Sequence, residues 1–179
     1  EEMSVESGNK SQAGKSLGLV PALDGHFFEQ QAALAHNDSG LFRDDWITLK
    51  ANPASPCIFT KGINLIRMPI RHGEGKFVAS DETIAKIEEK NLVALRYANP
   101  DGSIAKDFPA NPNGSINSIA GICDESGRIF GLMPHPEAFL SPFNDPEWTK
   151  KKVDDRLPAE GEGKIVFRNA VSFAASNLL

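Results

Sequence analysis

The residues best suited to chemistry are a histidine and a carboxylate two positions apart, His135 and Glu137. They follow a short apolar run, Gly131 to Met133, that stops at Pro134. Residues i and i+2 of an extended segment share a face, so the Glu137 carboxylate can hold the His135 imidazole in one tautomer. This is the base half of a nucleophile, base and orienter triad. The pattern also fits a strand-end histidine that is simply satisfied by a nearby acid.

A second polar stretch follows a strand-like run from Ile63 to Ile70. Loops after buried strands often carry function, and glycines let backbone donors and acceptors approach a ligand closely. The alternative is a solvated charge pair in a turn. The candidate ligand-binding residues of this stretch are His72, Gly73, Glu74 and Gly75.

Turn capping explains the polar residues of a third stretch, His36 to Gly40, without any ligand. Together with the second stretch it offers four metal-ligating side chains, but no ligand spacing supports a metal site. Those side chains are His36, Asp38, His72 and Glu74. We therefore predict no metal in this chain.

The elements that position these residues are predicted from hydrophobic patterning and turn signals. The last two predicted strands enclose Asp124 to Gly127 and form a hairpin with glycine in the left-handed conformation. A helix capped by Ser80 ends near Lys90, and a helix over Gly163 to Asn177 packs its apolar face on the sheet. Strands are predicted at Phe27 to Leu34, Trp46 to Lys50, Ile63 to Ile70, Asn91 to Tyr97, Ser118 to Cys123 and Arg128 to Met133, and a short helical turn at Pro146 to Val153.

Composition narrows the class of protein. The chain has 179 residues, of which 40% are hydrophobic, enough for one domain with a sizeable core. Its net charge of −5 and the lack of a basic stripe argue against nucleic acid as a partner. With neither an apolar run of membrane length nor a signal-peptide pattern, we expect a cytoplasmic protein without a membrane partner. Cys57 and Cys123 lie in apolar contexts and are predicted to be buried rather than nucleophilic.

Six motifs together give a specific resemblance. They are His36 to Gly40, Ser55 to Gly62, His72 to Phe77, Asn111 to Ser115, Ile119 to Ile122 and Gly131 to Glu137. With these motifs the chain resembles the glutaminase component of phosphoribosylformylglycinamidine synthase, a class I glutamine amidotransferase, over roughly Leu17 to Val171. The histidine-proline-glutamate element is shared by class I amidotransferases generally, whereas the third and fourth motifs point to the purine enzyme.

The resemblance implies a cysteine, histidine and glutamate triad that releases ammonia from glutamine, with His135 as base and Glu137 as orienting acid. It places His72 to Gly75 beside the substrate glutamine. The ammonia passes to a large synthetase component that uses ATP and Mg, and a small third subunit belongs to some such assemblies. No cofactor is implied in this chain itself.

Departures from the family pattern lie at the start of the chain. Counting back from Leu17 aligns Gln12 with a family glutamine of the substrate site, but puts Gly8 at the nucleophilic cysteine and Lys10 at the elbow glycine. Residues 1–16 are polar, so we expect a degenerate or disordered segment rather than the buried strand that feeds the elbow.

The resemblance therefore predicts an α/β, class I amidotransferase-like three-layer sandwich that is incomplete. Its N-terminal parallel half is expected to be missing, and its C-terminal part, residues 17–179, to be rich in antiparallel hairpins. Without a nucleophile such a chain is expected to be inactive. A non-catalytic docking or scaffold module that retains the amidotransferase surface is the alternative function.

Overall fold

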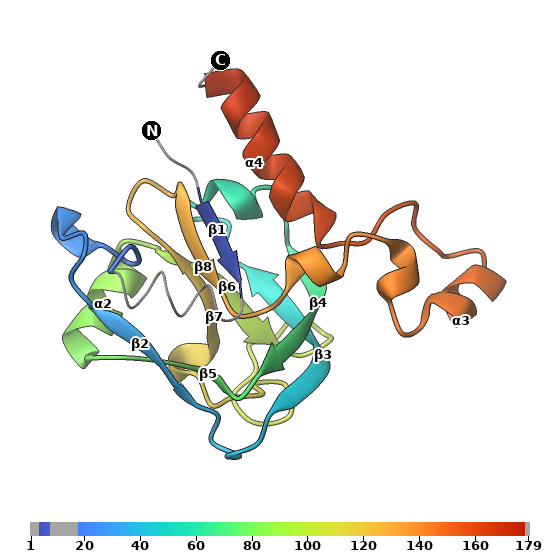
Figure 1. Ribbon diagram of the computed structural model, residues 1–179, viewed down its shortest axis with the longest axis horizontal. Coiled ribbons are helices and arrows are strands. Elements are labelled where there is room, and N and C mark those ends of the chain that lie inside the picture. The colour runs from blue at the N-terminus through green and yellow to red at the C-terminus, as the bar shows by residue number, and fades with distance from the viewer. Residues whose placement is uncertain (1–3, 8–17, 178–179) are drawn as a thin grey trace.

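The computed structural model describes residues 18–177 and the backbone of residues 4–7. Their strands form a six-stranded mixed sheet in the order β1-β8-β7-β6-β3-β4 and a two-stranded sheet of β2 and β5 (Figure 1). Only the β1–β8 pair of the larger sheet is parallel. The strands are β1 (Ser4–Ser7), β2 (Ala32–His36), β3 (Arg43–Ala51), β4 (Leu65–His72), β5 (Glu74–Ala79), β6 (Val93–Ala98), β7 (Ile119–Cys123) and β8 (Ile129–Leu132).

Over the part of the chain that the structure describes, the α-helices of this α/β fold are α2 (Asp81–Glu89), α3 (Trp148–Val153) and α4 (Lys164–Asn177). As predicted, the Ser80 side chain caps α2, accepting a hydrogen bond of 3.2 Å from the N–H of Thr83. The predicted helical turn before Val153 is α3. No helix within the described ranges has the length and apolar character that crossing a membrane requires.

The β7–β8 hairpin forms as predicted, with Gly127 in the left-handed region at a φ of 71°. A side chain here would also collide with the carbonyl oxygen of Pro56, which lies 2.2 Å from an added Cβ. The turn therefore requires glycine for two separate reasons. This turn sets the direction of β8, so that the chain continues from the strand end at Leu132 toward His135.

A strand lies where the sequence analysis expected none. β1 runs parallel to β8, with Ser4 opposite Ile129 and Ser7 opposite Leu132 (Figure 1). The expectation was wrong for these residues because backbone hydrogen bonds to β8 hold the strand, and they need no apolar side chains. The rest of the segment expected to be loose, residues 1–3 and 8–16, lies outside the described residues.

Two further elements differ from prediction. The strand expected from Phe27 begins only at Ala32, because Phe28 has a φ of 67°, outside the extended region, and is 79% exposed. Residues 74–79, read as part of a loop and its continuation, form β5 and pair with β2. The presumed loop is thus a tight connection at Gly73.

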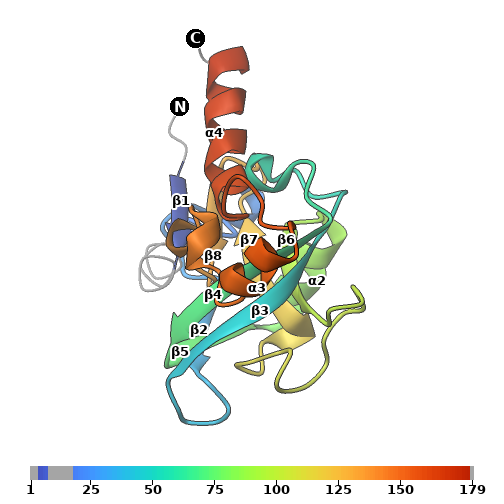
Figure 2. The ribbon, with the colours of Figure 1, turned by 90° about the vertical axis from the view of Figure 1, so that its right-hand side faces the viewer.

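The predicted C-terminal helix docks mainly through its N-terminal half, with Phe173 packing partly against the core farther along. Val166 is fully buried, and the side-chain amide of Asn169 donates to the carbonyls of Phe59 and Lys61 at 2.9 and 2.8 Å. Val171, expected on the packed face, is instead 67% exposed. Figures 1 and 2 show why: the C-terminal half of α4 projects beyond the body of the protein.

We predict that Phe130→Ala lowers the free energy of unfolding by about 3–5 kcal/mol, the usual loss for a buried phenylalanine. Phe130 lies fully buried on β8, and its ring stacks on Phe59 at a centroid distance of 5.7 Å. Denaturant unfolding measures the change. The control Phe28→Ala removes an exposed ring and should stay within about 0.5 kcal/mol of the parent chain; equal losses in both variants would contradict the packing described here.

Candidate active site

His135 and Glu137 form the predicted pair. The Nδ1 atom of His135 lies 2.6 Å from Oε1 of Glu137, at a short 3-10 turn over Pro136–Ala138. Because a carboxylate only accepts, the imidazole proton resides on Nδ1 and Nε2 keeps a lone pair. That Nε2 is buried and has no hydrogen-bond partner among the described residues. The pair therefore has the geometry of an oriented general base.

The backbone fixes where this base stands. The N–H of His135 donates to the carbonyl of Pro69 on β4 at 2.9 Å. Gly163 packs against the carbonyl of Pro136 so closely that an added Cβ would lie 2.1 Å from that oxygen. Both contacts hold the segment after β8 without using the His135 side chain, which leaves the imidazole free to act on a ligand.

The position expected for the nucleophile directly follows β1. Since β1 and β8 are parallel and Ser7 pairs with Leu132, both strands end at the same edge of the sheet. His135 lies three residues beyond that edge on one side, and Gly8 is the next residue on the other. Gly8 itself and the substrate-site candidate Gln12 lie outside the described residues.

His72 is a second buried imidazole at the site. Its Nδ1 lies 3.0 Å from Oδ1 of Asn37, while Nδ2 of Asn37 donates to the carbonyls of Leu41 and His72 at 2.8 Å each. These two donations identify Oδ1 of Asn37 as an acceptor, so Nδ1 of His72 carries the proton. Its Nε2 is consequently an acceptor, buried and without a partner among the described residues.

Electrostatics link the two histidines. Burial, together with repulsion from the nearby His135, lowers the pKa of His72 to about 4. His72 is therefore neutral at pH 7 and presents a lone pair. Two unsatisfied acceptors in one buried region call for a ligand that donates hydrogen bonds, such as an amide or ammonia.

Two asparagines that the sequence analysis did not single out hold the second stretch in place. Asn37 accepts from the N–H of Gly75 at 3.2 Å, and Asn113 donates to the carbonyl of Gly75 at 2.7 Å and to the Tyr97 hydroxyl at 2.9 Å. An added Cβ at Gly75 would lie 2.5 Å from the His72 ring, so glycine is required there. Both asparagines lie in motifs that the sequence analysis quoted, but these residues were interpreted only as turn residues.

The remaining candidates do not converge with the histidine pair. Glu74 is partly exposed and faces His36 at 3.5 Å, and Asp38 pairs with Lys76 at 2.6 Å. Within the described ranges no three histidine, cysteine, aspartate or glutamate side chains are grouped as metal ligands.

The two cysteines are buried, as predicted. Cys57 and Cys123 have no exposed surface, and the hydrogen bond that Cys123 donates to Cys57, together with burial, raises the pKa of the Cys123 thiol. A protonated, inaccessible thiol is a poor nucleophile. Neither cysteine can replace the nucleophile expected at Gly8.

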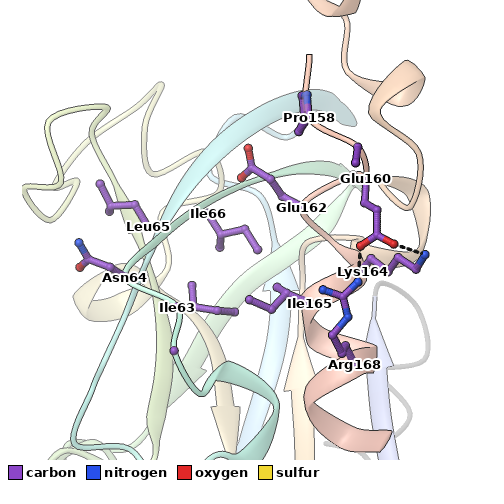
Figure 3. A pocket seen from close by; sticks show the side chains of 13 residues that line it. Ile63, Asn64, Leu65, Ile66, Pro158, Glu160, Glu162, Lys164, Ile165 and Arg168 are labelled. Carbon is purple, nitrogen blue, oxygen red and sulfur yellow. Dashed lines mark hydrogen bonds and ion pairs between the residues drawn. The ribbon is translucent and has the colours of Figure 1, made fainter. Parts of the chain in front are cut away.

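An apolar cleft of about 450 Å³ lies elsewhere, between the start of β4 and residues 158–168 (Figure 3). Ile63, Leu65 and Ile165 line it, and Glu160 bridges Lys164 and Arg168 at its rim. Glu162 closes the β4 edge here by accepting from the N–H of Arg67 at 2.8 Å. None of the predicted site residues lines this cleft, so it is separate from the histidine pair.

Comparison with known proteins places this geometry in a family. The family model of the CobB/CobQ-like glutamine amidotransferase domain matches residues 4–174. The chain belongs to this amidotransferase family. The matched range includes β1, which agrees with its parallel pairing to β8.

Individual relatives narrow the comparison. The chain is 42% identical over 168 residues to phosphoribosylformylglycinamidine synthase subunit PurQ of Dehalococcoides mccartyi, covering 93% of this chain and 61% of that protein. It is 40% identical over 172 residues to the PurQ subunit of Methanococcus maripaludis, covering 92% of this chain and 63% of that protein. The chain thus spans about three fifths of the length of these curated relatives.

A solved structure shares the fold. The structure of PurLQS from Thermotoga maritima matches with a TM-score of 0.62 and 29% identity, over 93% of this chain and 59% of that one. The resemblance inferred from the six motifs is confirmed by these relatives.

The buried His72 predicts a specific pH dependence of stability. Its pKa is about 4 in the folded protein and 6.5 as a model value, so the unfolded chain binds more protons between these pH values. Stability is therefore complete above pH 6.5 and falls as the pH drops toward 4, by on the order of 3 kcal/mol.

Denaturant unfolding of the parent chain and His72→Asn at pH 4, 5, 6 and 7 measures this contribution. The difference between the two curves should shrink as the pH falls, because the variant lacks the titrating group. His26→Asn, at an exposed histidine, serves as the control and should keep the parent's pH slope. Parallel curves for the parent and His72→Asn would refute the assignment of His72 as a neutral acceptor.

Proposed function

We propose that this chain is the glutaminase component, or part of it, of a phosphoribosylformylglycinamidine synthase. The observation that carries the proposal is the oriented pair His135–Glu137 beside the end of β1, with Nδ1 and Oε1 2.6 Å apart. The proposal requires the nucleophile position, directly after β1, to lie within reach of Nε2 of His135. This is the arrangement that nucleophilic amide hydrolysis needs.

The residues take roles as follows in this proposal. His135 is the base, and Glu137 orients it. His72 offers a neutral acceptor to the donor groups of glutamine, the connection at Gly73 and the start of β5 at Glu74 and Gly75 border the substrate, and Gln12 contributes from the segment after β1. The ammonia passes to a synthetase component that uses ATP and Mg; an assembly with a small third subunit fits the PurLQS relative.

Gly8 sets the limit on activity. Glycine has no side chain to attack the amide, so the chain with this sequence is proposed to be catalytically incompetent. Two candidate functions are compatible with this loss of the nucleophile. The first is a glutaminase whose nucleophile has been lost, and the second is a non-catalytic docking module with an amidotransferase surface. Gly8 is the observation that favours the second.

We expect the chain to release no glutamate from glutamine above the level of the His135→Ala variant, alone or with a synthetase component. A glutamine-directed electrophile should leave Cys57 and Cys123 unmodified, because both thiols are buried. A coupled glutamate assay and intact-mass measurement provide the two readouts. Glutamate release that depends on His135 would show that the chain is active and that Gly8 was misassigned.

The Gly8→Cys variant tests the site itself. A thiol beside His135 gains thiolate character, so we expect the same electrophile to label the introduced thiol, and the double variant with His135→Ala to react at least about tenfold more slowly. Turnover should remain absent, because Lys10 occupies the position where a strained elbow needs glycine.

Val153→Cys, at a residue 85% exposed on α3, supplies the matched control. Its labelling rate should not change when His135 is replaced. If the introduced thiol at position 8 also ignores His135, the proposed site is wrong. If it depends on His135 but a repaired elbow, Gly8→Cys with Lys10→Gly, still binds no glutamine, the docking function gains support.

A further inference from the structure

A polar pocket of about 460 Å³ lies apart from the histidine pair, beneath the loop that precedes β3. Its lining includes Asp38, Arg43, Lys106, Phe108 and Asn113. Neither the proposed reaction nor the sequence analysis uses Arg43. Its guanidinium is the feature of this pocket that requires an explanation.

The guanidinium of Arg43 lines the pocket and packs against an aromatic ring. Its Cζ lies 4.6 Å from the ring centroid of Phe108. Nε of Arg43 is buried and has no hydrogen-bond partner among the described residues. An arginine is always charged, so a buried, unpartnered donor on it is costly.

No acid of the described residues forms an ion pair with Arg43. The carboxylates near it in sequence are engaged elsewhere: Asp38 pairs with Lys76 at 2.6 Å, Asp44 pairs with Arg71 at 3.5 Å, and Asp45 accepts from the N–H of Trp46 at 2.7 Å. Lys106 adds a second positive charge to the lining, and Asp38 and Asp107 add negative ones. Among the described residues, Arg43 therefore lacks the anion that such a group normally engages.

We propose that this pocket binds a small carboxylate or phosphate anion, held by the guanidinium of Arg43 beside the Phe108 ring. A guanidinium matches a planar carboxylate or a phosphate through paired N–H donors. The volume admits a metabolite-sized ligand.

The pocket adjoins the elements that hold the histidine pair. Arg43 pairs with His72 in the β3–β4 register, and the N–H of Asp38 donates to the carbonyl of Asn113 at 3.2 Å. Asn113 in turn holds Gly75. An anion on Arg43 thus braces the same loops that position His72, although the proposed binding does not depend on the glutaminase function.

Titration with inorganic phosphate, and separately with glutarate, at constant ionic strength tests the proposal. Nitrogen-15 NMR should show one arginine Nε resonance moving saturably, and that resonance should be missing from Arg43→Gln. Thermal unfolding should show a Tm that rises with anion concentration in the parent chain. The stronger response of the two anions identifies the ligand chemistry.

Arg71→Gln is the matched control, since it removes the same charge from an exposed arginine one strand away. It should keep parent-like affinity, whereas Arg43→Gln should lose at least about tenfold. Arg43→Lys keeps the charge without the fork and should bind with intermediate affinity, which guards against a folding defect in the first variant. Equal anion responses in Arg43→Gln and the parent, or no saturable shift in the parent, would overturn the proposal.

Discussion

The hydrogen bond from the N–H of His135 to the carbonyl of Pro69 ties the end of β8 to β4. In the order of the sheet these strands are separated by β7, β6 and β3. Four spacings of about 4.8 Å would put them roughly 19 Å apart in a flat sheet, yet the residues from Leu132 to His135 span at most about 11 Å. The sheet must therefore curl, and this curl brings the two histidines together.

Burial then decides the chemistry of those histidines. Asn37 directs the His72 proton to Nδ1, and Glu137 does the same for His135, so both Nε2 atoms are acceptors. Because burial lowers the pKa of His72 to about 4, the His72 ring stays neutral near pH 7. Its buried acceptor suits a ligand with N–H donors, as the proposed function requires.

The same asparagine-based scaffold serves two places. Asn37 and Asn113 hold the connection around Gly75, and the loops that carry them also form the wall of the Arg43 pocket. Side-chain amides suit this task because each can donate and accept at once, satisfying several backbone groups with one residue. A rigid loop with buried, paired amides can thus lie between the proposed glutamine site and the proposed anion pocket and hold both in place.

The sequence by itself determined much of this protein. Alternating apolar patterns, the Ser80 cap and Gly127 predicted α2 and the β7–β8 hairpin, and the spacing of His135 and Glu137 predicted their contact, because all of these are local relations. Six motifs identified the family. Only tertiary structure decided the rest: the polar β1 forms because β8 offers it a backbone edge, and Val171 is exposed because α4 projects past the core. Likewise, His72 lies near enough to His135 to feel its charge, and Nε of Arg43 has no hydrogen-bond partner among the described residues. Both result from the packing of distant segments, which no short-range pattern encodes.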